Sequence, residues 1–283
     1  MMSLLAVEFA KLFKRKSTYF GYAALLANLS LILWAMARFK REMTGGMVQS
    51  QGIDAVGSPA TATFFAYWAM FAASWLVILF SVYVAGNTVA GEWASGTLRT
   101  TLCRPVSRAK LIIAKWVVAS CYSLSLTVFL VVASLLAGWA VLGFGDLVIP
   151  PMGPGQSSQK IIILPWDMAL VRFTLALGMQ FLWLEALMGL ALLASVVMKS
   201  GPVAIITVLG TLVSMAVLSV MPFEFFETLK PYFITSYYLG WQQGFRVSPD
   251  WVALIQDYWY TVVYAALSIT LAFSIFTARD ISA

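Results

Sequence analysis

The chain has 283 residues, of which 61% are hydrophobic and only 11% are charged, whereas about 25% of the residues in a soluble domain are charged. This composition excludes an ordinary soluble domain, and several apolar runs approach or exceed the ~20 residues that cross a bilayer. We therefore predict an all-α polytopic membrane protein, because the ~10-residue alternating segments of a β-barrel are not visible. The absence of histidine and the presence of only two cysteines disfavour an enzyme, a metal site and a disulfide framework.

The N-terminal residues 1–17 alternate apolar and charged side chains at helical spacing. Leu5 and Phe9 recur on one side, while Glu8 and Lys11 are among the charged residues. This pattern is typical of an amphipathic helix that lies at the membrane surface. An ordinary charged segment ahead of a membrane helix is the alternative.

Six apolar runs are predicted to be transmembrane helices. They cover residues 18–37, 62–85, 116–142, 171–198, 203–220 and 258–277. All six belong to a single transmembrane domain, residues 1–283. We expect an irregular external loop at 143–170 and an external segment at 222–257 that re-enters the membrane or lies at its interface. Trp241 and Trp251 of this segment are typical of an interfacial aromatic belt, with an external gate as the alternative.

The distribution of charge predicts the orientation. An even number of spans places both termini on the same side of the membrane. If that side is the cytoplasm, 11 Lys or Arg residues and 3 acidic residues face the cytoplasm, whereas 7 and 8 face outside. This excess of basic residues predicts cytoplasmic termini. The net charge of +6 therefore reflects topology and does not indicate a nucleic-acid partner.

The longest polar interval in the first half of the chain, residues 86–115, separates the second and third predicted spans. It contains, in order, Glu92, Gly96-Thr97-Leu98, Pro105-Val106-Ser107-Arg108 and Lys115. This pattern, joined to six spans and an amphipathic lead-in, resembles the permeases of the ABC-2 family, the membrane subunits of type V ABC transporters. The resemblance covers nearly the whole chain.

Elementary chemistry predicts a short, rigid helix in this interval. Glu92 near the start of a short helix would complement the positive end of its dipole, and Gly96 would let another backbone approach closely. Pro105 cannot continue a helix, and Ser107 can cap the next one. A plain solvated hairpin with basic anchors is the alternative.

In the family this short helix is the coupling helix, which faces the cytosol and docks into a groove of an ATPase subunit. The resemblance therefore implies a set of ATPase-docking residues. They are Glu92, Gly96, Thr97, Leu98, Arg99, Arg104, Pro105, Ser107 and Arg108.

The sequence contains no G-x-x-x-x-G-K-[ST] pattern, so the chain cannot hold nucleotide phosphates in a P-loop. We expect no catalytic, cofactor-binding or metal-binding residues in it. The resemblance implies two cytosolic ABC ATPase subunits, which bind ATP and Mg²⁺, and a second permease subunit, identical or paralogous. The expected function is that of the permease of an ABC exporter among the lipids of a bacterial inner (plasma) membrane. An ion-coupled secondary transporter is the alternative.

One acidic residue, Glu185, falls in the middle of the fourth predicted span. A carboxylate inside the membrane is costly and indicates a functional site by default. Glu185 is therefore a candidate for the substrate path or for a contact with the other subunit. The alternative is a packing residue, either protonated or hydrogen-bonded to Asn28 of the first span. Glu185 and Asn28 are together the candidates for the substrate path.

Overall fold

The computed structural model describes residues 2–39, 60–98, 107–149, 162–246 and 248–278. Within these residues, six helices are long and apolar enough to cross a membrane, which confirms an all-α polytopic membrane protein. They are α2 (Lys16–Arg38), α4 (Ala62–Ala94), α6 (Arg108–Leu142), α7 (Trp166–Val197), α8 (Gly201–Val220) and α10 (Trp251–Ala278).

Most of these helices are longer than the sequence predicts. In particular, α4 continues past residue 85 to Ala94, and α6 begins at Arg108 and not at residue 116. The reason is that an apolar run indicates the part of a helix that lies in lipid, whereas backbone hydrogen bonding continues into polar sequence where no proline intervenes. The interval 86–115 is therefore largely the ends of α4 and α6, and only residues 95–107 connect them.

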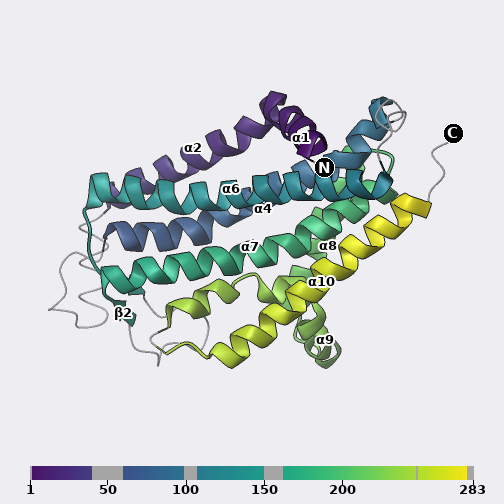
Figure 1. Ribbon diagram of the computed structural model, residues 1–283. Coiled ribbons are helices and arrows are strands. Elements are labelled where there is room, and N and C mark those ends of the chain that lie inside the picture. Colours follow the sequence, from purple (N-terminus) through teal and green to yellow (C-terminus); the bar gives the residue numbers. More distant parts are fainter. Residues whose placement is uncertain (1, 40–59, 99–106, 150–161, 247, 279–283) are drawn as a thin grey trace.

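The helices α4 and α7 form the centre of the bundle (Figure 1). In their most apolar windows 61% and 67% of the residues are buried, against 17% to 22% in α2, α8 and α10. The central pair packs against every other spanning helix, with α2 on α4, α10 on α7, and α6 and α8 on both. The outer helices therefore turn most of their apolar side chains away from the protein, as expected for residues in contact with lipid.

The predicted N-terminal helix is present as α1 (Met2–Lys14), which contacts α2 and α6. Leu12 is buried, and Leu5 and Phe9 pack against the core. Helix α1 and the end of α10 lie at the same end of the bundle as the end of α4 and the start of α6 (Figure 1), as an even number of spans requires. The location of α1 at a membrane surface stays a prediction.

The opposite end of the bundle contains a small antiparallel hairpin of β1 (Leu147–Ile149) and β2 (Ile162–Leu164). The expectation of an irregular loop over residues 143–170 is wrong here, because two short apolar triplets rich in β-branched residues pair with each other. The hydroxyl of Thr63 donates to the carbonyl oxygen of Gly145 at 2.8 Å. This bond holds the start of the hairpin segment against the start of α4.

Short helices connect α8 to α10. They are α9 (Glu224–Leu229) and the 3-10 helices η1 (Lys230–Tyr232), η2 (Ile234–Tyr237) and η3 (Gly240–Phe245). Trp241 and Phe245 are completely buried, and the indole of Trp183 in α7 donates to the carbonyl oxygen of Ile234 at 2.7 Å. Trp241 therefore belongs to the core and not to the predicted interfacial belt, whereas Trp251 is exposed.

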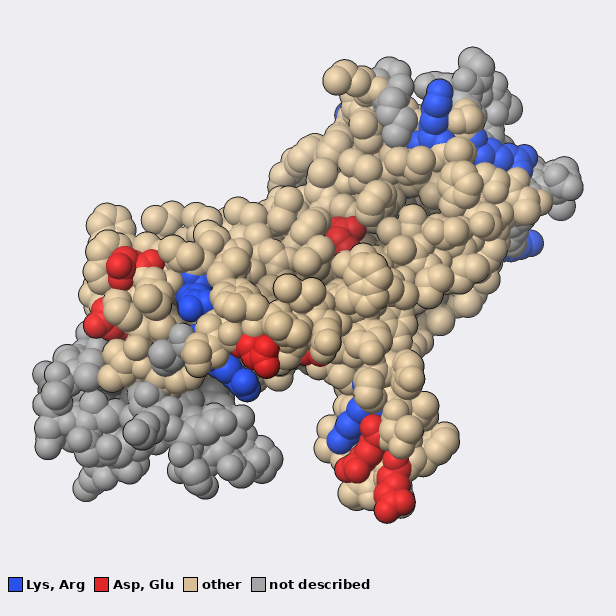
Figure 2. Space-filling view, turned by 60° about the horizontal axis from the view of Figure 1, so that its bottom comes forward, with Lys and Arg blue, Asp and Glu red and all other residues tan. Residues whose placement is uncertain are grey.

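Charged side chains are concentrated toward the two ends of the molecule and on one projecting part (Figure 2). The surface between them is largely uncharged, as a protein surrounded by hydrocarbon requires.

Candidate functional site

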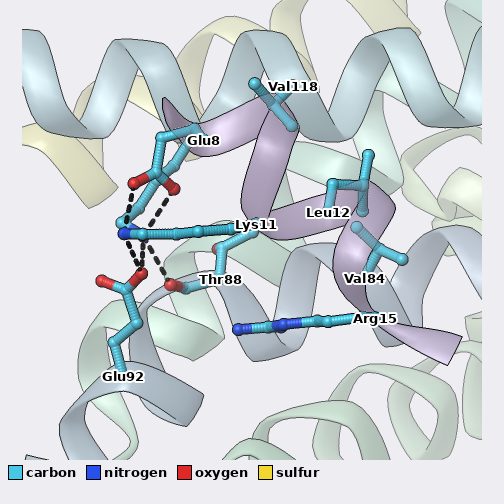
Figure 3. A pocket seen from close by; sticks show the side chains of 9 residues that line it. Glu8, Lys11, Leu12, Arg15, Val84, Thr88, Glu92 and Val118 are labelled. Atoms are coloured by element: carbon cyan, nitrogen blue, oxygen red, sulfur yellow. Dashed lines mark hydrogen bonds and ion pairs between the residues drawn. The ribbon is translucent and has the colours of Figure 1, made fainter. Parts of the chain in front are cut away.

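Four charged side chains meet where α1 crosses the ends of α4 and α6, and we call them the charge cluster. They are Glu8, Lys11, Glu92 and Lys115. The ammonium of Lys11 lies 2.6 Å from one carboxylate oxygen of Glu8 and 2.8 Å from Glu92, and Figure 3 shows it between the two. The ammonium of Lys115 lies 3.0 Å from Glu8 and 2.9 Å from Glu92. Each lysine thus contacts both carboxylates, and the four charges sum to zero.

Three members of the charge cluster are shielded from solvent, whereas the side chain of Lys11 is 34% exposed. Lys115 is 1% exposed, and Glu92 and Glu8 are 4% and 6% exposed. Such charges are tolerated away from water only when they are paired and hydrogen-bonded, and Lys115 also donates to the carbonyl oxygen of Thr88 at 2.9 Å. Burial lowers the pKa of Lys11, but the bonds to Glu8 and Glu92 outweigh it and raise that pKa above 10.5.

The local sequence explains how the cluster forms. Glu8 and Lys11 are three residues apart on α1 and therefore share a face. Glu92 lies in the last turn of α4, so its predicted place near the start of a short helix is wrong. It cannot complement the positive end of a helix dipole there, and its charge is compensated instead by Lys11 and Lys115.

The end of α4 leads directly into the connection with α6. Ser95 caps α4, and its amide bonds to the carbonyl oxygen of Gly91 at 3.1 Å. Gly96 has a φ of 70°, which favours glycine, and among the described residues other than its chain neighbours no atom lies within 4 Å of where its Cβ would be. Thr97 is exposed, whereas Leu98 is 2% exposed and packs into an apolar cluster of helix ends. Ser95 and Gly96 therefore form an exposed turn, and Thr97 and Leu98 after it are helical, with the side chain of Leu98 packed against the helix ends.

The start of α6 is capped as predicted. The hydroxyl of Ser107 accepts a hydrogen bond from the amide of Lys110 at 3.4 Å. Arg108 donates to the carbonyl oxygen of Thr277 at 3.3 Å, which links the start of α6 to the end of α10. Three of the predicted docking residues lie outside the described residues, namely Arg99, Arg104 and Pro105.

Glu185 lies inside α7 and is 9% exposed. One carboxylate oxygen accepts from the indole of Trp116 at 3.1 Å and from the hydroxyl of Ser120 at 2.8 Å. The other oxygen is buried without a hydrogen-bond partner among the described residues. The predicted bond to Asn28 is wrong, because α6 supplies both partners and Asn28 belongs to α2, which packs on α4 and α6.

The sequence analysis did not predict that Glu8 would be a partner in the charge cluster, or that Trp116 would be a partner of Glu185. Glu8 follows Leu5 by three residues and precedes Leu12 by four, so it falls on the apolar side of α1. A carboxylate in that position signals a buried ion pair. No comparable signal connects Trp116 to Glu185, since they lie on different helices.

The comparison with protein families agrees with this arrangement. The family model described as ABC-2 family transporter protein matches residues 4–152, which is more than half of the chain. The matched region contains α1, α2, α4 and α6 and therefore all four residues of the charge cluster. No curated protein matches the chain.

Proposed function

The chain belongs to the ABC-2 family of transporter proteins, and we propose that it acts as the transmembrane permease subunit of an ABC exporter. Membership of the family makes it an integral membrane permease that works with an ABC ATPase. The finer proposal is that a separate cytosolic ATPase in two copies binds ATP with Mg²⁺ and drives export. A second permease subunit, identical or paralogous, completes the path in a bacterial inner membrane, with both termini of this chain in the cytoplasm.

The observation that carries this proposal is that the end of α4 at Ala94 and the start of α6 at Arg108 are joined by only residues 95–107 of the chain. They join the ends of α4 and α6, which are the two longest helices among the described residues. A helix is a stiff element, so a displacement of this connection acts directly on two spans.

The charge cluster extends this mechanical connection to α1. Because Lys115 of α6 contacts Glu8 of α1 and Glu92 of α4, the ends of the three helices cannot separate without exposing a buried charge. The hydrogen bond from Arg108 to the carbonyl oxygen of Thr277 also links the end of α10 to these helices. Movement at the connection is therefore shared by four helices and not confined to a loop.

ATP can drive such movement only if the ATPase contacts the connection differently in its open and closed states. We propose that the exposed residues Ser95, Gly96 and Thr97, together with Arg99 and Arg104, make those contacts. Glu92 acts indirectly, by holding the turn in place, because it is buried.

The test is co-purification of the ATPase together with a transport assay. The double variant Arg99→Ala and Arg104→Ala should lose ATPase binding and transport while retaining its folded elution profile. Lys230→Ala, in the segment between α8 and α10, is the matched control and should change neither. Undiminished ATPase binding and transport in the double variant would overturn the docking assignment. Transport that persists without ATP but stops when the ion gradient collapses would favour the secondary transporter.

A further inference from the structure

The hydroxyl group of Ser195, near the end of α7, contacts the backbone of α4. Its oxygen accepts hydrogen bonds from the amides of Val89 and Ala90 at 3.0 Å and 2.9 Å. Ser195 is completely buried, so water does not compete for these bonds. In a regular helix each amide donates to the carbonyl oxygen four residues earlier. A side chain that bonds to two successive amides of another helix is therefore a contact that ordinary helix packing does not require.

Two further side-chain bonds occur at the same turn of α4. The carbonyl oxygen of Ala85 is the regular helical partner of the amide of Val89, and it accepts from the hydroxyl of Thr88 at 2.7 Å. The ammonium of Lys115 donates to the carbonyl oxygen of Thr88 at 2.9 Å. The carbonyl of Thr88 and the amide of Val89 belong to one peptide group. This peptide group of α4 is thus bonded to α6 on one side and to α7 on the other.

The turn from α7 into α8 packs closely against the same part of α4. A Cβ at Gly86 of α4 would lie only 2.8 Å from the Cγ1 atom of Ile205 in α8. A Cβ at Gly201, the first residue of α8, would overlap the side-chain oxygen of Asn87. Glycine at both positions lets the helices approach closely. The bonds of Ser195 therefore lie within a tightly packed contact.

The contact of Ser195 differs in kind from the apolar packing around it. Apolar packing is non-directional, so it resists the separation of two helices more than it resists sliding or rotation. Hydrogen bonds weaken steeply when their angle departs from the preferred range, so the hydroxyl fixes the register of α7 against α4. A displacement of the end of α4 must therefore either displace α7 or break two buried hydrogen bonds.

We propose that Ser195 is a positioning residue that transmits movement of the end of α4 to α7. The inference rests on the proposed function, in which the ATPase moves residues 95–107. Hydrogen-bond networks between rigid elements can transmit such movement. Ser195 acts through the amides of Val89 and Ala90, and it adds α7, which contains Glu185, to the helices that respond to the ATPase.

Hydrogen-exchange mass spectrometry of the full-length chain in complex with its ATPase tests the proposal. Exchange is measured without nucleotide and after trapping with ATP, Mg²⁺ and vanadate, at the ends of α4 (residues 86–94) and α7 (residues 189–197). In the original chain, trapping should change the exchange rates at both ends by at least about fivefold, the lower limit of a typical coupling between sites. In Ser195→Ala the change at α4 should remain, whereas the change at α7 should fall below about twofold, under that limit.

Ser134→Ala is the matched control. Ser134 of α6 is also completely buried, but its hydroxyl donates to the carbonyl oxygen of Val131 in its own helix at 2.9 Å. Its loss should therefore leave both changes intact. A general loss of stability would raise exchange with and without nucleotide, so the difference between the two states reports transmission. Ser195→Cys, which has a similar size and a weaker acceptor, replaces Ser195→Ala if the latter does not bind the ATPase.

Two outcomes would overturn the inference and leave the proposed function standing. One is an undiminished change at α7 in Ser195→Ala. The other is a response of α4 without any response of α7 in the original chain. If trapping changed neither helix end in the original chain, the proposed function would fail, and the inference would fail with it.

Discussion

The charge cluster and Glu185 are two ways of burying a carboxylate in the same bundle. In the cluster, Glu8 and Glu92 each contact two ammonium groups near the helix ends. Within the described parts of the chain, Glu92 leaves one oxygen unbonded, as Glu185 does, but the other oxygen of Glu92 is shared by two positive charges. The donors that Glu185 has there are both neutral.

This difference suggests different roles for the two sites, which the variants below test. The four charges of the cluster neutralise one another, so the cluster has no net charge with which to attract a ligand, and its effect is to hold α1, α4 and α6 together. Glu185 has no counter-ion within the described residues, and its unpaired oxygen is free to accept a proton or a cationic group. An uncompensated carboxylate inside a membrane protein is therefore the better candidate for the substrate path.

Removal of Lys115 should have the largest effect. Lys115→Met leaves Glu8 and Glu92 with Lys11 as their shared cation, and we expect the free energy of unfolding to fall by about 3–5 kcal/mol. Unfolding in mixed micelles of increasing SDS content, followed by circular dichroism, measures this change. A loss below about 1 kcal/mol, as for an exposed ion pair, would show that the cluster does not hold the helices together.

Removal of one charge of each sign should do less damage. The double variant Lys115→Met and Glu92→Leu keeps Glu8 paired with Lys11 at 2.6 Å and buries no excess charge. We expect it to regain about 1–3 kcal/mol relative to Lys115→Met alone. The same SDS titration of both single variants and the double variant completes the cycle, and strict additivity would contradict the shared arrangement.

Replacement of Glu185 should cost little stability. Glu185→Gln keeps an oxygen that accepts from Trp116 and Ser120, so we expect a change within about 1 kcal/mol in the same titration. Glu185→Leu, the control, leaves both donors unpaired and should cost about 1–3 kcal/mol. A transport rate that falls in Glu185→Gln would assign the carboxylate to the substrate path, and an unchanged rate would assign it to packing.

The smallest predicted effect is a difference in how stability depends on pH between the original chain and Lys11→Met. The pKa of Lys11 is raised above 10.5 by its carboxylate partners, so its contribution to stability is fully present below that pH and is lost as the pH rises through the raised value. Between neutral pH and strongly alkaline pH, the original chain should therefore lose more stability than Lys11→Met. Parallel titrations of both proteins measure the difference, and identical pH profiles would contradict the pairing of Lys11.

The six spans could be predicted because each apolar run is long enough to decide its own structure. The cap at Ser107 depends on neighbouring residues and could be predicted for the same reason. The position of Glu92 could not be predicted in this way. Hydropathy falls after residue 85, whereas the helix continues to Ala94, and the partners of Glu92 lie on two other helices.

The tryptophans of residues 222–257 also depend on contacts that the sequence could not predict. Trp241 and Trp251 lie in the same segment predicted to be external, yet Trp241 is completely buried and Trp251 is 49% exposed. The difference depends on η3 packing against α7, far away in the chain. Composition therefore identified the segment, but only the tertiary contacts decided which tryptophan faces outward.

The bond between Glu8 and Lys115 also constrains the order in which the protein is assembled during synthesis. The two residues are separated by 107 positions, so the ribosome translates α2 and α4 before Lys115 exists. Until the start of α6 has been made, the carboxylate of Glu8 has only Lys11 of its own helix as a cation. The N-terminal helix reaches its final place only after the two spans that follow it have been synthesised.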